Sequence, residues 1–308
     1  MTWGSVALQS IRLILVVSGI VVAAVLALRI VTLILEPRLA FQPPRRYAAT
    51  PAALALPFED VFMRTEDGVR IHGWFIPGTE QPARRDDSRA PARPRLTLLL
   101  FHGNAENIGG FLDLALLART TGYNLMLVDY RGYGESAGQP SESGLYSDGR
   151  AALAYLRSRR DVDAARIVVW GRSIGSAVAV EAAADDAGAD RGRGAEAAPL
   201  AGVILESPFT SVAELLRDGG HPVLLILSRF GTYRFDSASR IGRIHSPILI
   251  IHGTADDIAP FRLGRRLFEL APGRKELVAI EGGGHNDLWA FHEAEVWGAA
   301  RRFLSTLN

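Results

Sequence analysis

The sequence predicts an α/β protein whose central sheet is mostly parallel and eight-stranded, with helices on both of its faces. After about residue 96, apolar runs alternate with segments of helical periodicity. These runs are continuously apolar, as strands covered on both faces are. Ahead of them, EDVFMRT and VRIHGWFI flank Glu66-Asp67-Gly68, and an Asp-Gly pair between two alternating runs is typical of a β-hairpin. The hairpin and six later runs give eight strands.

The elements follow one another in a regular order along the chain. The six continuous strands are LTLLLFH, NLMLVDY, RIVVW, GVILES, PILIIHG and ELVAIEG. Helical periodicity is found between them at 106–120, 141–159, 174–185, 262–271 and 287–306. Two polar segments fit neither pattern, and we expect surface loops at 79–95 and 185–199. A chain of 308 residues, 48% of them hydrophobic, is long enough to bury one large core.

The N-terminal segment differs from the rest of the chain. Leu13 to Leu35 is apolar apart from Arg29 and is about 23 residues long, which is enough to cross a bilayer. A cleaved signal peptide and a buried helix are the alternatives, but no A-x-A site follows closely. Residues 1–40 are therefore predicted to form a single-pass membrane anchor, and 41–57 a Pro-rich tether to the domain. More arginines follow the span than precede it, which favours a cytoplasmic domain.

Composition excludes several classes of partner and site. A net charge of +1 argues against nucleic-acid binding, because contacts with phosphates need an excess of Lys and Arg. The chain has no Cys, which removes disulfides, thiolate metal sites and cysteine nucleophiles. No H-x-x-H or carboxylate cluster has metal-ligand spacing, so neither a metal nor a cofactor is expected.

The run VVWGRSIGSAV contains the pattern G-x-S-x-G at Gly171 to Gly175. In this pattern a sharp turn between a strand and a helix presents a nucleophilic serine, here Ser173. Ser176, one helical turn later, is the nearest alternative. The backbone N–H after the nucleophile, that of Ile174, is expected to donate to the oxyanion of the reaction.

Polar residues follow the other strands at the same edge of the predicted sheet. A serine nucleophile needs a neutral imidazole as base and a carboxylate to orient it. In chain order, Asp256 and His285 follow the last two strands and supply these groups. Asp257, adjacent to Asp256, and Glu206, which follows an earlier strand, remain alternatives for the acid.

These segments together resemble the α/β-hydrolase fold, and within it the Bem46-like, membrane-anchored ABHD-type group. The matching segments are HGNAEN (102–107), DYRGYGES (129–136), GRSIGS (171–176), ESPFTS (206–211), HGTADDIAP (252–260) and GGGHND (282–287). The resemblance covers about residues 55–305. It implies a hydrolase domain over residues 41–308 and a serine hydrolase acting on esters or thioesters, often with lipid acyl chains. It also places the second oxyanion N–H on Asn104, or on Ala105 if the loop is displaced by one residue.

The expected activity is therefore that of a membrane-anchored serine hydrolase with a small-molecule or lipid acyl substrate. A serine peptidase on the same fold is one alternative, and a non-catalytic membrane binding protein is another. An insert at about 207–246 is expected to form a small cap. Its apolar run VLLIL, within 221–235, is a candidate lid or acyl-chain wall, although a buried connecting helix fits equally well.

Several other polar and aromatic residues are expected to be structural. Arg131 is predicted to pair locally with a carboxylate, and Asp287 to cap the last helix. His102 and His252 are expected to hold loops, and His292 to lie inside the final helix. Core packing is the default for three aromatic residues, which are Trp170, Phe209 and Tyr233.

Overall fold

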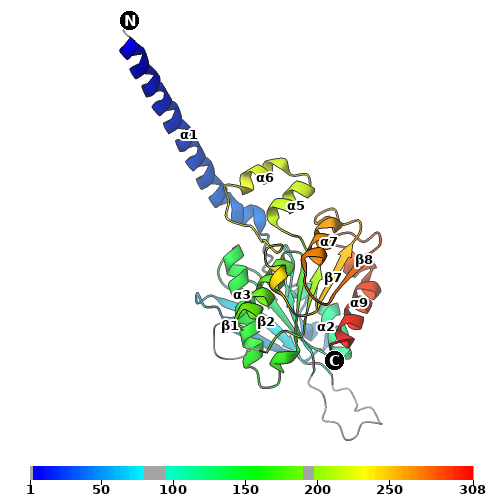
Figure 1. Cartoon of the computed structure of the whole chain (residues 1–308). Coiled ribbons are helices and arrows are strands. Elements are labelled where there is room, and N and C mark those ends of the chain that lie inside the picture. The colour runs from blue at the N-terminus through cyan, green and yellow to red at the C-terminus, as the bar shows by residue number, and fades with distance from the viewer. Residues whose placement is uncertain (1–2, 80–94, 190–197, 308) are drawn as a thin grey trace, which may run out of the picture.

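The computed structural model describes residues 3–79, 95–189 and 198–307. Its centre is one eight-stranded sheet of order β1-β2-β4-β3-β5-β6-β7-β8 (Figure 1). Strands β3 to β8 are parallel, whereas β1 and β2 are antiparallel to their neighbours. The strands are β1 (Glu59–Arg64), β2 (Arg70–Ile76), β3 (Thr97–Phe101), β4 (Asn124–Asp129), β5 (Ile167–Arg172), β6 (Gly202–Glu206), β7 (Ile248–Gly253) and β8 (Lys275–Ile280). The predicted mostly parallel sheet of eight strands is confirmed.

Helices cover both faces of the sheet, which explains why its strands are continuously apolar. In β3, Leu99 and Phe101 pack into one core with α3, α4 and α7, whereas Leu98 and Leu100 pack into a second core with α2 and α9. The helices are α1 (Trp3–Ala40), α2 (Leu112–Thr120), α3 (Glu142–Ser158), α4 (Ile174–Ala189), α5 (Val212–Asp218), α6 (Pro222–Ser228), α7 (Phe261–Leu270), α8 (Leu288–Phe291) and α9 (Glu293–Ser305).

The predicted hairpin joins β1 to β2. The two strands pair from Glu59 opposite Phe75 to Arg64 opposite Arg70. Gly68 in the turn between them has φ +81°, a conformation that glycine adopts without the strain that a side chain would bring. The Asp-Gly pair was therefore a correct signal for the turn.

The predicted helices are found, with differences at their ends. The segment 106–120 begins with a short 3₁₀ turn at Ile108–Gly110 before α2. The segment 287–306 is two helices, because the chain breaks at His292, where φ is −126°. His292 therefore lies between α8 and α9, and its predicted place inside one final helix is wrong.

The two predicted surface loops lie largely outside the described residues. The segment 79–95 overlaps the undescribed range 80–94, and 185–199 overlaps the undescribed range 190–197. The first residues of the second segment belong to α4, which continues to Ala189.

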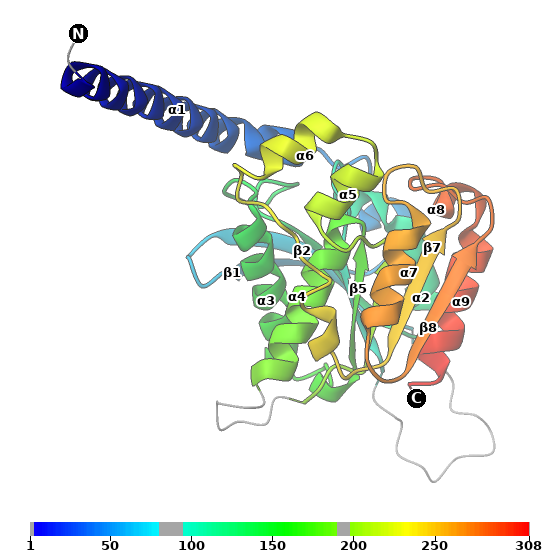
Figure 2. The same ribbon diagram turned by 45° about the horizontal axis from the view of Figure 1, so that its top comes forward.

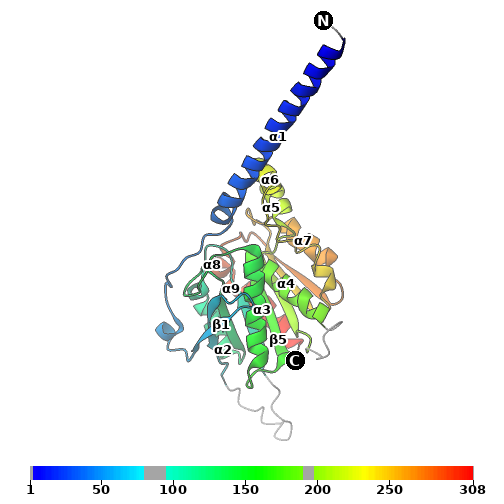
Figure 3. The same cartoon turned by 90° about the vertical axis from the view of Figure 1, so that its left-hand side faces the viewer.

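Helix α1 projects away from the domain (Figures 1 and 3). The most apolar stretch within Ile11–Ala40 has a mean hydropathy of 2.8, and none of it is buried. It is long and apolar enough to cross a membrane, although a signal sequence meets the same criteria. The helix includes the predicted span Leu13–Leu35 and is longer at both ends.

The segment that follows α1 is fixed to the domain along its length. Phe41 is buried against Tyr233, with ring centroids 5.3 Å apart. Asn107 donates from its side-chain amide to the carbonyl groups of Pro44 and Arg46. The stretch predicted as a tether is therefore part of the packed structure.

Helices α5 and α6 come from the insert between β6 and β7. They lie above the end of the sheet to which α1 is attached, with α6 beside the last part of α1 (Figures 1 and 2). This is the place predicted for a small cap, and it is the edge at which the carboxyl ends of the parallel strands meet.

Candidate active site

Ser173 occupies the turn between β5 and α4, as the G-x-S-x-G pattern predicts. Its φ is +52°, a strained conformation for a residue with a side chain. A side chain at Gly171 would clash with the carbonyl of Gly175, and one at Gly175 would clash with the carbonyl of Phe101. Both glycines are needed because α4 starts so close to the sheet, and the turn leaves the Ser173 side chain half-exposed.

A continuous chain of hydrogen bonds joins the three residues predicted as nucleophile, base and acid. His285 Nε2 lies 2.9 Å from Ser173 Oγ, and His285 Nδ1 lies 2.8 Å from Asp256 Oδ2. The residues come from the ends of β5, β7 and β8, so the carboxyl edge of the sheet brings them together. The neutral imidazole consistent with this geometry carries its proton on Nδ1 and accepts from the serine at Nε2.

The Asp256 carboxylate is held by donors on both of its oxygens. Oδ1 accepts from the backbone N–H groups of Ile258 and Ala259, at 3.1 and 2.7 Å. Burial opposes ionisation, but hydrogen bonds from His252 and His285 and the N–H of Ala259 hold the pKa of Asp256 below its usual value. Asp257, the alternative acid, is exposed to solvent.

His252 fixes the loop that carries Asp256. Its Nε2 lies 2.7 Å from the carbonyl of Ala259 and 3.3 Å from Asp256 Oδ2. The predicted role of His252 in holding a loop therefore agrees with the contacts.

Glu206, the other alternative acid, is engaged elsewhere. Its buried carboxylate lies 3.3 Å from Arg172 Nε and accepts from the indole N–H groups of Trp170 and Trp289. Burial raises the pKa of Glu206, and the charge of Arg172 opposes this rise. The Glu206 side chain has no contact with His285 among the interactions of the described residues.

Two backbone N–H groups are free to face a developing oxyanion. Ile174 is the first residue of α4, so its N–H has no partner within the helix. The N–H of Asn104 donates to no other described residue. The Asn104 loop is next to Ser173, since a Cβ built on Gly103 would lie 3.5 Å from the Cβ of Ser173. Ala105 continues the same turn with φ +55°.

The Asn104 side chain has a role that the sequence did not reveal. Its Nδ2 donates to the carbonyl of Ala40, and its Oδ1 accepts from the N–H of Gln42 and the hydroxyl of Tyr133. The side chain thus ties the loop to the end of α1 and leaves only the backbone N–H available to a substrate.

Arg172, the variable residue of the elbow before Ser173, connects three segments of the site. It pairs with Glu106 at 2.8 Å and donates to the carbonyl of His285 at 3.4 Å, in addition to its contact with Glu206. Glu106 in turn accepts from the N–H of Gly103. In the sequence, the only sign of this network was a charged residue directly before Ser173.

The remaining residues singled out in the sequence are structural. Arg131 pairs with Asp67 and with the buried Asp148. Ser176 is buried, and its hydroxyl donates to the carbonyl of Ser173. Asp287 precedes α8, but its carboxylate accepts from the N–H of Gly284 and caps no helical N–H. The three aromatic residues assigned to the core are buried, and they are Trp170, Phe209 and Tyr233.

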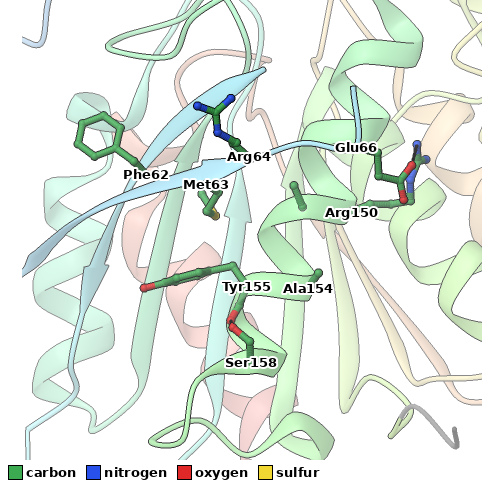
Figure 4. A pocket seen from close by; sticks show the side chains of 9 residues that line it. Phe62, Met63, Arg64, Glu66, Arg150, Ala154, Tyr155 and Ser158 are labelled. Carbon is green, nitrogen blue, oxygen red and sulfur yellow. Dashed lines mark hydrogen bonds and ion pairs between the residues drawn. The ribbon is translucent and has the colours of Figure 1, made fainter. Parts of the chain in front are cut away.

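A hollow elsewhere on the described surface lacks the chemistry of this site. A hollow between β1 and α3 is lined by side chains that include Met63, Arg64, Tyr155 and Ser158 (Figure 4). It lies at the β1 edge of the sheet, away from β5. Within residues 3–79, 95–189 and 198–307, no three His, Asp or Glu side chains are grouped to hold a metal ion.

Comparison with known families places the chain among hydrolases. The family model described as "Serine aminopeptidase, S33" matches residues 92–238. An uncharacterized protein of Mycobacterium tuberculosis is 38% identical over 80% of this chain and 79% of its own length. Protein bem46 of Schizosaccharomyces pombe is 33% identical over 80% of this chain and 77% of its own length. The α/β-hydrolase domain-containing protein WAV2 of Arabidopsis thaliana is 30% identical over 93% of this chain and 91% of its own length.

Solved structures share the fold. The esterase Pf2001 of Pyrococcus furiosus superposes with a TM-score of 0.65 over 87% of this chain and 97% of its own, at 19% identity. An acetyl xylan esterase from Paenibacillus sp. R4 superposes with a TM-score of 0.57 over 85% of this chain and 96% of its own, at 21% identity. The fold, the order of its motifs and these relatives lead to one conclusion: the chain belongs to the α/β-hydrolase superfamily, in its Bem46-like group.

Proposed function

We propose that this protein is a membrane-anchored serine hydrolase that cleaves acyl esters or thioesters, with lipid-like acyl groups as its substrates. The observation that carries the proposal is the hydrogen-bonded chain from Asp256 through His285 to Ser173. A nucleophile, a base and an orienting acid in this geometry are the minimum set for acyl transfer through a covalent intermediate.

In the acylation half-reaction, the Ser173 hydroxyl oxygen attacks the carbonyl carbon of the substrate while His285 Nε2 takes its proton. The Asp256 carboxylate stabilises the imidazolium that forms. The oxygen of the tetrahedral intermediate becomes negative, and the N–H groups of Ile174 and Asn104 donate to it. His285 then gives its proton to the leaving alcohol or thiol, the bond to that group breaks, and an acyl-serine remains.

Deacylation repeats these steps with water as the nucleophile. His285 takes a proton from the water as it attacks the acyl carbon and returns that proton to Ser173 Oγ as the acid leaves. No co-reactant other than water is required. The hydrogen bonds from Gln42 and Tyr133 to the side-chain oxygen of Asn104 support a fixed position for its backbone N–H in both half-reactions.

The name of the matching family model favours a serine peptidase as the second candidate. An aminopeptidase must recognise the ammonium group of its substrate, and a free carboxylate near the nucleophile is the natural partner. The carboxylates that flank the elbow, Glu106 and Glu206, are both paired with Arg172. This pairing favours acyl substrates without a positive charge beside the scissile bond.

The proposed anchor is α1, and the proposed domain boundaries are residues 1–40 for the anchor and 41–308 for the hydrolase domain. The apolar length of α1 supports a spanning helix. The arginines at 38, 45 and 46, which follow the span, support a cytoplasmic domain. An anchored domain receives acyl chains that need not cross bulk water.

A panel of substrates tests the proposed activity. The purified full chain in detergent micelles is given acyl esters, acyl thioesters and aminoacyl amides that release the same reporter, with Ser173→Ala as the blank. We expect Ser173-dependent release from an ester or a thioester. Release from the aminoacyl amide alone would establish peptidase activity instead. If none of the substrates gave Ser173-dependent release, a non-catalytic membrane binding protein would be the remaining alternative.

A further inference from the structure

Helix α6 of the cap lies beside the end of the apolar part of α1. Glu36 directly follows Leu35, the last residue of the apolar run of α1. Its carboxylate accepts from the N–H and hydroxyl of Thr232 and from the N–H of Tyr233. These two residues follow α6 by only a few positions, and α6 lies beside α1 in three views of the molecule (Figures 1, 2 and 3).

The outer side of α6 is apolar and exposed. Val223, Leu224 and Ile226 have relative exposures of 67%, 39% and 56%. Val223 and Ile226 are three positions apart and so share one side of the helix. Outside α1 and α6, the exposed large apolar residues of the described chain occur singly along the sequence, and they are Leu54, Phe62, Leu116, Ile258 and Phe291.

The charges around this apolar side are those that a phospholipid surface attracts. Arg217 and Arg229, which stand near the ends of α5 and α6, are exposed. Of the two acidic groups on α5, Asp218 pairs with Arg262, and Glu214 is half-buried and accepts from the hydroxyl of Thr210. An apolar helical side with arginines at its margin is typical of a helix that lies in the membrane interface.

We propose that α6 is a second membrane contact, in which Val223, Leu224 and Ile226 enter the boundary between headgroups and acyl chains of the bilayer that α1 crosses. This inference rests on the proposed anchor. Glu36 connects the two elements, so α6 is held at the level where the apolar part of α1 ends. Continuity with a spanning helix favours a bilayer over a second protein copy as the occupant of this surface.

The contact has a consequence for the active site. The cap begins just after β6, whose last carbonyl, that of Glu206, accepts the N–H of Ser173 at 2.9 Å. With α6 in the interface, the cap and the carboxyl edge below it are held against the membrane. An acyl chain then reaches Ser173 from the lipid phase beside the cap.

Site-specific labelling tests the contact in the full chain. The protein has no cysteine, so one introduced cysteine carries the only thiol label. The variants Val223→Cys and Ile226→Cys receive a polarity-sensitive fluorophore and are reconstituted into phosphatidylcholine–phosphatidylserine vesicles. Some vesicles also carry a lipid with a nitroxide quencher, either near the headgroup or near the end of the acyl chain. Phe62→Cys and Leu116→Cys, both at exposed apolar positions away from α6, are the matched controls.

Labels at 223 and 226 are expected to shift to the blue and to be quenched several-fold more by the nitroxide near the headgroup than labels at 62 and 116. Equal quenching at all four positions would overturn the proposal. A blue shift at 223 and 226 without quenching by lipid would also overturn it, and it would indicate contact with protein. Val22→Cys in α1 separates the two proposals, because quenching by the deep nitroxide there reports the anchor itself. Quenching at 22 without quenching at 223 and 226 refutes the α6 contact alone, and no quenching at 22 refutes the anchor and the contact together.

Discussion

The side-chain amide of Asn104 donates to the carbonyl of Ala40, the last residue of α1, across 2.9 Å. The loop that is proposed to supply one oxyanion donor is therefore fastened to the end of the proposed anchor. Phe41, the next residue, is buried against Tyr233 of the cap. The end of α1 thus helps to hold a loop of the candidate site in place, in addition to its proposed role as a membrane anchor.

Two truncations test this structural role of the end of α1. Removing residues 1–30 leaves Glu36 and Ala40 in place, and we expect hydrolysis of soluble acyl esters at a rate close to that of the full chain. Removing residues 1–40 deletes both groups and frees the Asn104 amide. Because misplacing an oxyanion donor costs on the order of 10²-fold in kcat, the longer truncation should be strongly impaired.

The measurement is kcat on a short, water-soluble ester for both truncated chains, with circular dichroism to check that each is folded. Equal kcat values for the two folded truncations would show that the contact between Ala40 and Asn104 has no part in positioning the loop.

The two neighbouring aspartates should differ sharply in their effect on turnover. Asp256→Asn removes the carboxylate that fixes the imidazole of His285 in the correct tautomer, and such a change lowers kcat by about 10⁴-fold in a serine triad. Asp257→Asn, at an exposed neighbour, should stay near the wild-type rate. Glu206→Gln is a second control. A loss of kcat there as large as that in Asp256→Asn would assign the role of the acid to Glu206.

The pKa of Asp256 predicts how stability depends on pH. Because the folded state holds this pKa below the unfolded value of about 3.9, the ionised carboxylate stabilises the fold above about pH 4. This contribution is lost as the pH falls towards the folded pKa. Relative to Asp256→Asn, the wild type should therefore lose unfolding free energy below about pH 4.

Thermal unfolding of both full-length proteins in detergent between about pH 5 and pH 3 measures this change, since stability differences appear as shifts in Tm. A difference in Tm between them that does not change over this range would mean that Asp256 has no depressed pKa in the folded protein.

Arg172 should act on turnover without touching the substrate. Its side chain fixes Glu106 and the carbonyl of His285, so Arg172→Met should lower kcat and leave KM nearly unchanged. Hydrogen bonds between charged partners contribute about 1.5–3 kcal/mol, which sets the expected loss at roughly 10- to 100-fold. Adding Glu106→Gln to Arg172→Met should lower kcat little further, because the two side chains act as one pair. Fully additive losses in kcat would contradict this coupling.

The sequence predicted the strands and singled out Ser173, Asp256 and His285 as a candidate triad because both inferences depend on local pattern and chain order. Continuous apolar runs locate β3 to β8, and in this fold the residues just after such runs meet at one edge. The motif also located the elbow, whose close approach to the sheet leaves no room for side chains at Gly171 and Gly175.

Contacts between distant segments could not be predicted in the same way. The bond from Asn104 to Ala40 joins residues 64 positions apart, and the bonds from Thr232 to Glu36 join residues 196 apart. Neither pair has a local pattern, so a Pro-rich segment after an apolar helix looked like a free tether. The break at His292 was missed for a related reason, since no Gly or Pro marks the end of α8 there.

The most direct test of the proposed role of Ser173 is the site of covalent labelling by a fluorophosphonate. The wild-type chain should be labelled, and peptide mass spectrometry should find the adduct on Ser173, because only that hydroxyl is hydrogen-bonded to His285 Nε2 among the described residues. Ser173→Ala should not be labelled, whereas Ser176→Ala, which keeps the nucleophile, should be. An adduct on another residue, or labelling of Ser173→Ala at the wild-type level, would contradict the assignment of Ser173 as the nucleophile.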